Sequence, residues 1–388
     1  EPVLAAPAPF GDWLEDVRLE AARRGISSGT IETALTDLEP IPRVVELDRR
    51  QPEFSRTFAD YIQIAVSEER VQRGKDVMRR HGGLLADLER QYGVPARFLA
   101  AIWGLETNFG QVTGGFPVIG ALATLSYDGR RGEFFRRELF NALTIVDQGH
   151  ISASAMQGSW AGAMGHTQFM PSTFLRHAVD HTGDGRADIW NSVPDALGSA
   201  ANYLHNLGWN FGYTWGRQVR LPEDFDYSLV SVDAGAMELR LPLSRWAELG
   251  VRRVGGGALS AAEISAAVVT PEGAGGAAFL VYDNYNVILD WNRSVFYAIA
   301  VGHLADRLVG APPLVSLATS AKALSRDEVI ALQAGLIELG FLSGSADGIL
   351  GSGTRRAVRA FQKANGLQTD GYADHALAAE VAGQTGAR

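Results

Sequence analysis

The sequence predicts a mainly α protein with a minor β-sheet, an α+β fold built from one large and one small domain. Apolar residues recur at helical spacing through most of the first part of the chain, whereas the later segment AAFLVYDNYNVILDW alternates as strands do. The paired prolines Pro312 and Pro313, followed by small and polar residues, are typical of a linker. We therefore predict a large domain over residues 1–310, a linker over 311–324 and a small domain over 325–388.

The composition of the 388-residue chain excludes several classes of function. It has no cysteine, which rules out thiol nucleophiles, disulfides and cysteine-ligated metals. The net charge of -9 argues against nucleic acid as a partner, and no stretch approaches the roughly 20 apolar residues of a transmembrane segment. Residues 322–388 carry seven basic and seven acidic side chains, so the negative charge belongs to the large domain. The chain opens at Glu1 with a Pro/Ala-rich leader, from which we expect an exported protein whose signal peptide has been removed.

Several helices are expected along the large domain. Four apolar residues at i, i+3, i+4 and i+7 predict a helix over residues 10–17, and the pair Ser27 and Ser28 can cap a second short helix through Ile31 and Leu35. A longer helical region is predicted over 60–91, broken at a glycine pair that begins at residue 82. Short strand-like pieces follow within residues 225–254.

One carboxylate is expected on a buried face. The segment YGVPARFLAAIWGLETNFG predicts a helix from Pro95 to Gly110, in which Glu106 continues the apolar stripe of Leu99 and Trp103. Burial beside an indole favours the protonated form of a carboxyl group, and a protonated glutamate can act as a general acid. The alternative is an ordinary ion pair between Glu106 and an arginine of another helix.

A glycine-rich segment follows about 50 residues downstream. In GSWAGAMGHTQFMPSTF, Gly158, Gly162 and Gly165 let backbone come close to another group, and Ser159 and Gln168 supply a hydroxyl and an amide. Hydroxyl and amide groups beside an apolar wall suit a neutral sugar chain that carries hydroxyl and acetamido groups. A helix crossing with glycines at the contact is the alternative.

Four motifs occur in the order AIWGLETNFG, LATLSYDGRRGEFF, GSWAGAMGHTQFMPSTF and DGRADIWNSVPDALGSAANYL. Together they resemble the membrane-bound lytic transglycosylase B family and its soluble relatives, enzymes of bacterial peptidoglycan turnover, over most of residues 10–308. The resemblance implies a lysozyme-like core with one catalytic glutamate, matched by Glu106. It also implies substrate-binding roles for Ser159, Gln168, Phe169, Tyr203, Asn292 and Tyr297. Arg130 and Arg131 match an arginine pair expected near the peptide or lactyl carboxylates of the substrate.

The implied reaction cleaves the β-1,4 bond between N-acetylmuramic acid and N-acetylglucosamine without adding water. Glu106 would protonate the glycosidic oxygen and then take the proton of the C6 hydroxyl, which attacks C1 and closes a 1,6-anhydro ring. The 2-acetamido group would assist at C1, held with its neighbours by Ser159 and Asn292. No cofactor is required, and Asp128 and Glu133 are expected to be structural or solvated. The alternatives are a muramidase, which hydrolyses the same bond, and a non-catalytic peptidoglycan-binding protein.

The segment DHTGDGRADIWN resembles an EF-hand calcium loop. Asp180, Thr182 and Asp184 stand at positions 1, 3 and 5, and the carbonyl of Arg186 stands at position 7. Position 12 lacks the usual glutamate, and members of the family that bind calcium here use a later aspartate, which would match Asp195. The alternative is an Asp-Gly turn stabilised by hydrogen bonds from its own side chains to backbone.

The small domain is expected to contain three short helices over residues 325–385. The pattern of LQAGLIELGFL, ADGILGSGTRRAVRAFQKANGL and TDGYAD is similar to the three-helix peptidoglycan-binding domain. Its binding surface is expected around residues 347–354, and a helical appendage packed on the large domain is the alternative. The expected partners are glycan strands of peptidoglycan in the periplasm, with cell-wall synthesis or division proteins as further candidates.

Overall fold

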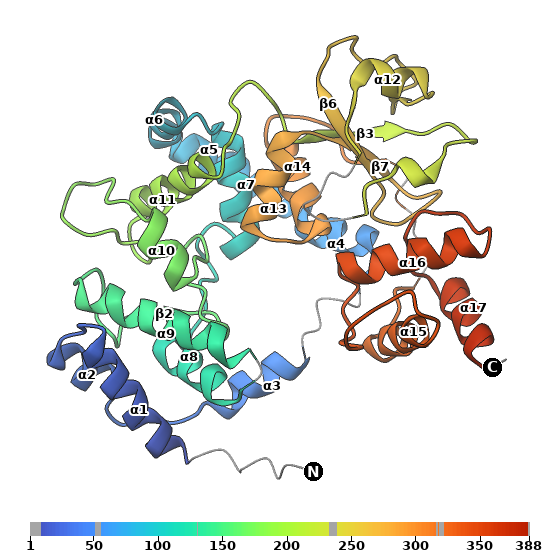
Figure 1. Ribbon diagram of the computed structural model, residues 1–388. Coiled ribbons are helices and arrows are strands. Elements are labelled where there is room, and N and C mark those ends of the chain that lie inside the picture. The colour runs from blue at the N-terminus through green and yellow to red at the C-terminus, as the bar shows by residue number, and fades with distance from the viewer. Residues whose placement is uncertain are drawn as a thin grey trace. The chain divides into compact units, whose positions relative to one another are not determined.

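The chain folds into two compact units. The computed structural model describes residues 9–50, 56–129, 131–232, 239–315, 317 and 322–386 (Figure 1). Unit 1 consists of Glu1–Gln51 and Asp76–Asn206, and unit 2 consists of Pro52–Lys75 and Leu207–Arg388. Unit 2 thus joins the end of the predicted large domain to the C-terminal helices, and the domain bounds drawn from the sequence stay a prediction. Among the residues within these described ranges, no helix is both long and apolar enough to cross a membrane.

Unit 1 is helical, with one short antiparallel ribbon. Its helices are α1 (Phe10–Arg23), α2 (Ser28–Leu35), α3 (Pro42–Arg50), α6 (Gly82–Tyr92), α7 (Ala96–Thr107), α8 (Val118–Tyr127), α9 (Gly132–Asp147), α10 (Pro171–His177) and α11 (Val193–Asn206). In the ribbon, β1 (Phe116–Pro117) pairs with β2 (Gln157–Gly158). Eight of the twelve residues of α7 and nine of the ten residues of α8 are buried, so these two helices belong to the core of the unit.

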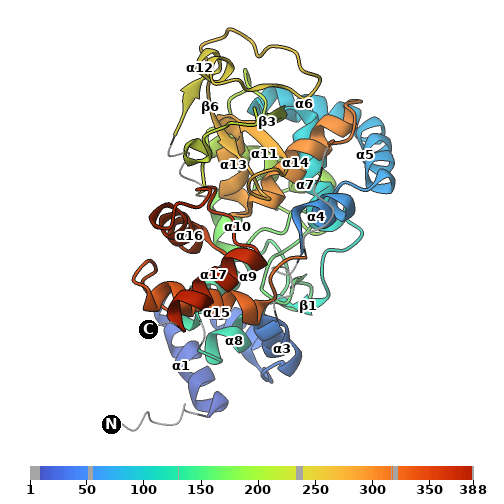
Figure 2. The same cartoon turned by 90° about the vertical axis from the view of Figure 1, so that its right-hand side faces the viewer.

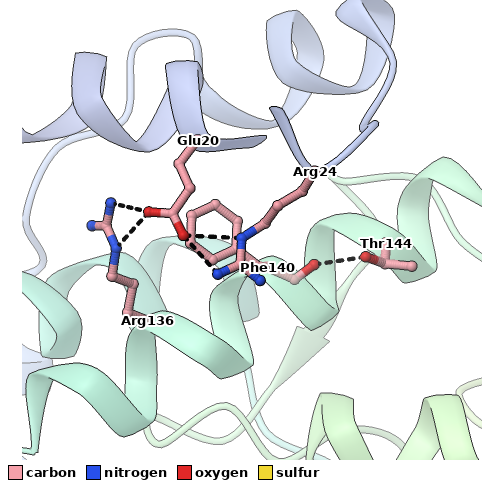
Figure 3. Close-up of polar contacts among 5 residues, drawn as sticks. All are labelled: Glu20, Arg24, Arg136, Phe140 and Thr144. Carbon is pink, nitrogen blue, oxygen red and sulfur yellow. Dashed lines mark hydrogen bonds and ion pairs between the residues drawn. The ribbon is translucent and has the colours of Figure 1, made fainter. Parts of the chain in front are cut away.

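An ion-pair cluster fixes the N-terminal helix α1 to α9 (Figure 3). The carboxylate of Glu20 accepts hydrogen bonds from both Arg24 and Arg136, with a shortest distance of 2.6 Å to each. The Arg24 guanidinium also lies 4.2 Å from the centre of the Phe140 ring. Burial by itself raises the pKa of Glu20, but the hydrogen bonds from the two arginines outweigh it and lower that pKa. The carboxylate therefore stays ionised and holds α1 in place at neutral pH.

The helices predicted near the N-terminus are confirmed, with one difference. Helix α1 covers the predicted residues 10–17, and the Ser27 side chain caps α2 by accepting the N–H of Thr30. The region predicted over 60–91 breaks at the glycine pair, as expected, but it breaks a second time after Ala65, where α4 ends. The C-cap residue Val66 leaves the helical conformation there.

Unit 2 contains a five-stranded antiparallel sheet with the order β4-β6-β7-β3-β5. Its strands are β3 (Gly216–Arg220), β4 (Leu241–Pro242), β5 (Arg252–Arg253), β6 (Ser265–Val269) and β7 (Ala278–Val281). Its helices are α4 (Phe58–Ala65), α12 (Leu243–Glu248), α13 (Asp283–Trp291), α14 (Val295–Leu308), α15 (Arg326–Glu338), α16 (Ser352–Ala364) and α17 (His375–Thr385), while α5 (Glu68–Arg80) spans the border of the two units. Leu280 faces the core that includes Trp246 of α12, and the neighbouring Phe279 contacts the ring of Phe58 in α4.

The strand predicted from AAFLVYDNYNVILDW is wrong for its second half. Only residues 278–281 form a strand, and α13 begins at Asp283. In α13, Tyr285, Ile288 and Leu289 are buried at i, i+3 and i+4, a helical spacing that the aromatic content of the segment had concealed. The short strands expected within 225–254 are present as β4 and β5, two residues each, with α12 between them.

The three C-terminal helices are confirmed as α15, α16 and α17, which lie together in both views (Figures 1 and 2). Two buried glutamines hold the Asp-Gly turns between them. The side-chain oxygen of Gln333 accepts the N–H of Gly348, and Gln362 makes the same contact with Gly371, each at 2.8 Å. The carboxylate of Asp370 in the second turn also accepts the N–H of Ala274 at 2.8 Å, which docks this helical module on the loop between β6 and β7.

Candidate functional site

Glu106 lies in the last turn of α7, where the buried helix reaches the surface. The residues of α7 from 98 to 104 are all buried, whereas Glu106 is partly exposed. The helix ends at Thr107, earlier than predicted, because Asn108, Phe109 and Gly110 all adopt left-handed backbone conformations. Left-handed residues other than glycine are strained and gather at functional sites. The carboxyl group therefore sits just before a sharp, strained turn.

The glycine-rich segment is a loop that packs closely on its neighbours. Up to Met170 it contains two antiparallel bridges, Gly158 to Met164 and Met164 to Phe169, and no helix, and α10 begins at Pro171. The helix crossing considered from the sequence is therefore wrong for the glycines at 158, 162 and 165. The expected close approach is confirmed, because a Cβ on Gly158 would lie 2.2 Å from the carbonyl oxygen of Ala163. The Ser159 hydroxyl accepts the N–H groups of Ala161 and Ala163, which leaves its own hydrogen to donate.

Three other predicted residues belong to the same part of unit 1. The Gln168 amide donates to the carbonyl of Thr113, beyond the end of α7, at 3.0 Å, and to that of Gly165 at 2.9 Å. The buried Phe169 ring meets the Tyr203 ring of α11 edge to face, with centroids 5.6 Å apart. Gln168 and Phe169 thus tie the loop to the segment after α7 and to α11.

The predicted arginine pair is described for one residue only. Arg130 lies outside the described residues. Arg131 donates to the carboxylate of Asp48, which is 1% exposed, at 2.7 Å, so it has a structural partner in unit 1. Asp128 forms an ion pair with Arg49 at 2.9 Å, and Glu133 is exposed in the first turn of α9, which agrees with the structural or solvated roles expected for them.

Asn292 and Tyr297 belong to unit 2. Asn292 is exposed and caps the C-terminus of α13, where its carbonyl accepts the N–H of Ser294. Tyr297 is buried in the first turn of α14, and its N–H donates to the Ser294 side chain, which is the N-cap of that helix. Their roles toward a substrate stay predictions.

In the predicted calcium loop, the carboxylates accept hydrogen bonds from backbone N–H groups of the loop itself. Asp180 accepts the N–H groups of Gly183, at 2.6 Å, and Gly185, at 2.7 Å. Thr182 also donates its hydroxyl to Asp180, the Asp184 carboxylate accepts the N–H of Arg186, and Asp195 is fully buried and accepts three backbone N–H groups. Within the described ranges, no three His, Asp or Glu side chains converge as metal ligands. These hydrogen bonds are those of the Asp-Gly turn considered from the sequence, and a calcium role for the loop stays a prediction.

Two residues of unit 1 were not anticipated from the sequence. Glu138, a carboxylate that is 4% exposed, accepts the N–H of Ser172 at 2.8 Å and so fixes the start of α10 directly after the glycine-rich loop. His166 accepts a hydrogen bond from the indole of Trp103 at 3.1 Å. Neither has a signal in the sequence, because each contact joins segments more than 30 residues apart.

Comparison with models of known protein families shows which family the chain belongs to. The model of the transglycosylase SLT domain matches residues 9–306, and that of a peptidoglycan binding domain matches residues 325–380. The chain belongs to the transglycosylase SLT domain family. It also carries a C-terminal peptidoglycan binding domain, and this confirms the resemblance drawn from the motifs.

Relatives with known structures share this fold. The crystal structure of SltB3 from Pseudomonas aeruginosa in complex with NAG-anhNAM-pentapeptide is 43% identical, with a TM-score of 0.89 that covers 96% of this chain and 99% of that one. Membrane-bound lytic murein transglycosylase B of Escherichia coli is 32% identical over 249 residues, 62% of this chain, and the chain spans 64% of the length of that curated relative. The Escherichia coli lytic transglycosylase Slt35 in complex with calcium is 26% identical, with a TM-score of 0.66 that covers 79% of this chain and 94% of that one.

Proposed function

We propose that this protein is a lytic transglycosylase that cleaves the MurNAc–GlcNAc bond of peptidoglycan and leaves 1,6-anhydroMurNAc ends. The observation that carries the proposal is the likeness, over nearly the whole chain, to a protein solved with an anhydromuramoyl ligand. The position of Glu106 supports it, because a carboxyl group at the partly exposed end of a buried helix can reach substrate while the helix holds it in place.

In the proposed reaction the Glu106 carboxyl gives its proton to the glycosidic oxygen, and the bond from that oxygen to C1 of the muramoyl sugar breaks. The resulting carboxylate takes the proton of the C6 hydroxyl, and the C6 oxygen forms the new bond to C1. Protons and electrons balance without water. The Ser159 hydroxyl, whose oxygen already accepts two backbone N–H groups, donates to the acetamido carbonyl and orients it.

The C-terminal module supplies attachment to the substrate in this proposal. Its match to a peptidoglycan binding domain supports a role in holding the enzyme on the cell wall, where local substrate concentration is high. We assign the protein to the periplasm on the same grounds, since its substrate lies there. Partners among cell-wall synthesis or division proteins stay predictions.

Mass spectrometry of digested sacculi tests the proposed function. Muropeptides released by a lytic transglycosylase carry anhydro ends that are lighter by one water than the reducing ends left by a muramidase. We expect anhydro ends alone. Reducing ends would support hydrolysis, and binding to sacculi without release of muropeptides would support the non-catalytic alternative.

Removal of metal ions is expected to change neither activity nor stability. The carboxylates of Asp180 and Asp195 already accept backbone N–H groups, so we expect the loop of residues 180–195 to fold without a cation. Protein dialysed against EDTA should keep its melting temperature and its rate of muropeptide release. A fall in the melting temperature that added calcium restores would instead assign a calcium site to this loop.

A further inference from the structure

Hydrogen bonds join His166 to residues that precede and follow Glu106 in the chain. The Trp103 indole, three residues before Glu106, donates to Nδ1 of His166 at 3.1 Å. The Thr107 hydroxyl, directly after Glu106, donates to the backbone carbonyl of His166 at 2.7 Å. The same hydroxyl accepts the N–H of Gly110 at 3.0 Å, which fixes the strained turn. One residue of the glycine-rich loop therefore holds the helical turn that carries the candidate catalytic carboxyl.

The space around the imidazole is closely filled. The His166 and Trp103 rings meet edge to face with centroids 5.6 Å apart, and the backbone N–H of His166 donates to the carbonyl of Ile189. A Cβ on Gly110 would lie 2.3 Å from two atoms of the His166 ring. The ring thus packs against both Trp103 and the backbone of Gly110, and its hydrogen bond to the indole depends on its protonation state.

The hydrogen bond between Trp103 and His166 requires a neutral imidazole. An indole N–H can only donate, so Nδ1 of His166 must be the unprotonated nitrogen and the imidazole must be neutral. Protonation would place an N–H against the indole N–H and break the hydrogen bond. Burial lowers the pKa of His166, and the Asp188 carboxylate opposes this only in part, so the neutral form prevails at neutral pH. As the pH falls through this lowered pKa, the hydrogen bond and its contribution to stability are lost.

Among the described residues, other titratable side chains also lie near Trp103 and His166. Glu106 lies three residues after Trp103 on α7, and Asp188 lies in the loop that receives the His166 N–H. His81 packs on Trp103, with centroids 5.7 Å apart, and burial followed by the charge of Arg80 lowers its pKa as well. No hydrogen bond joins His81 to Trp103 in the described part of the chain, so His81 provides a control.

We propose that His166 is a positioning residue, which holds the Glu106 turn in its active geometry only while the imidazole is neutral. The inference rests on the proposed function. It predicts that activity falls on acidification because protonation of His166 breaks the Trp103–His166 hydrogen bond. A displacement of about 1 Å at a catalytic group can reduce the rate by about 10²-fold.

A direct test follows the indole N–H of Trp103 by NMR in the substrate-free full-length protein, with the resonance assigned by its absence in Trp103→Phe. We expect one transition, below about pH 6.5, the ordinary value for histidine. His166→Asn should remove this transition, because the amide oxygen accepts the hydrogen bond without titrating, and His81→Asn should keep it. This readout needs no catalysis, so it stands even if the lytic activity is absent. A resonance that does not move, or a transition that disappears in His81→Asn, overturns the proposal.

The kinetic test compares His166→Phe with His166→Asn. Phenylalanine keeps a ring but leaves the Trp103 N–H without its acceptor, so kcat should fall about 10- to 100-fold at neutral pH while KM stays within about 3-fold. Asparagine should keep kcat within about 3-fold and extend activity to lower pH. Equal activity of the phenylalanine variant and the wild type, or an unchanged pH profile in His166→Asn, overturns the proposal.

Discussion

Replacing Glu106 by glutamine is expected to reduce the release of muropeptides from sacculi by at least about 10³-fold. Glutamine has the same shape but can neither give nor take the proton, and a positioned acid or base contributes about 10²- to 10⁴-fold to a rate. In the proposed reaction the one carboxyl serves both proton transfers, so a single substitution removes both. Binding to sacculi and the melting temperature should stay as in the wild type.

Glu133→Gln is the matched control, because it makes the same chemical change on the neighbouring motif. Glu133 is exposed in the first turn of α9, and such surface substitutions usually change stability by less than about 0.5 kcal/mol. The control should release muropeptides at the wild-type rate. Activity that survives in Glu106→Gln, or is lost in Glu133→Gln, would mean that another carboxyl group moves the proton.

The sequence was sufficient to place Glu106 on the apolar stripe of a helix because that pattern is local, whereas its catalytic role comes from the family resemblance and stays a prediction. A helix of period 3.6 puts Leu99, Trp103 and Glu106 on one side, and α7 follows that pattern over Ala96–Thr107. The same reasoning found α15 and α16, whose apolar residues recur at helical spacing. The end of α7 was misplaced by three residues because left-handed conformations at Asn108 and Phe109 depend on contacts made elsewhere in the fold.

Contacts between distant segments set the limit of that reasoning. The hydrogen bond from Trp103 to His166 crosses 63 residues, and no spacing in the sequence indicates it. The segment after β7 was misassigned for a related reason. Its aromatic and β-branched residues favour strands, but α13 buries Tyr285, Ile288 and Leu289 together on one side, and tertiary packing overrides the local preference.

Gly114→Ala is expected to be the most damaging single-methyl substitution near the site. Gly114 has a φ of 93°, a conformation that L residues rarely adopt, and an added Cβ would lie 2.1 Å from the carbonyl oxygen of Gly158. The overlap is with backbone, so no side chain can rotate to relieve it. Overpacking costs about 1–3 kcal/mol and a strained φ about 1–3 kcal/mol, so we expect a loss of about 2–6 kcal/mol in the free energy of unfolding.

Gly115→Ala separates this backbone clash from a general effect of adding a methyl group. Its Cβ would meet nothing within 4 Å, and Gly115 is not among the glycines with positive φ. We expect it to change stability by less than about 1 kcal/mol. Thermal melting should therefore show a drop of about 5–15 °C for Gly114→Ala alone. Activity should fall with it even below the melting transition, because Ser159 directly follows Gly158 and would move when that backbone yields. Equal melting temperatures for the two variants would mean that β2 gives way without cost and that the site does not depend on this contact.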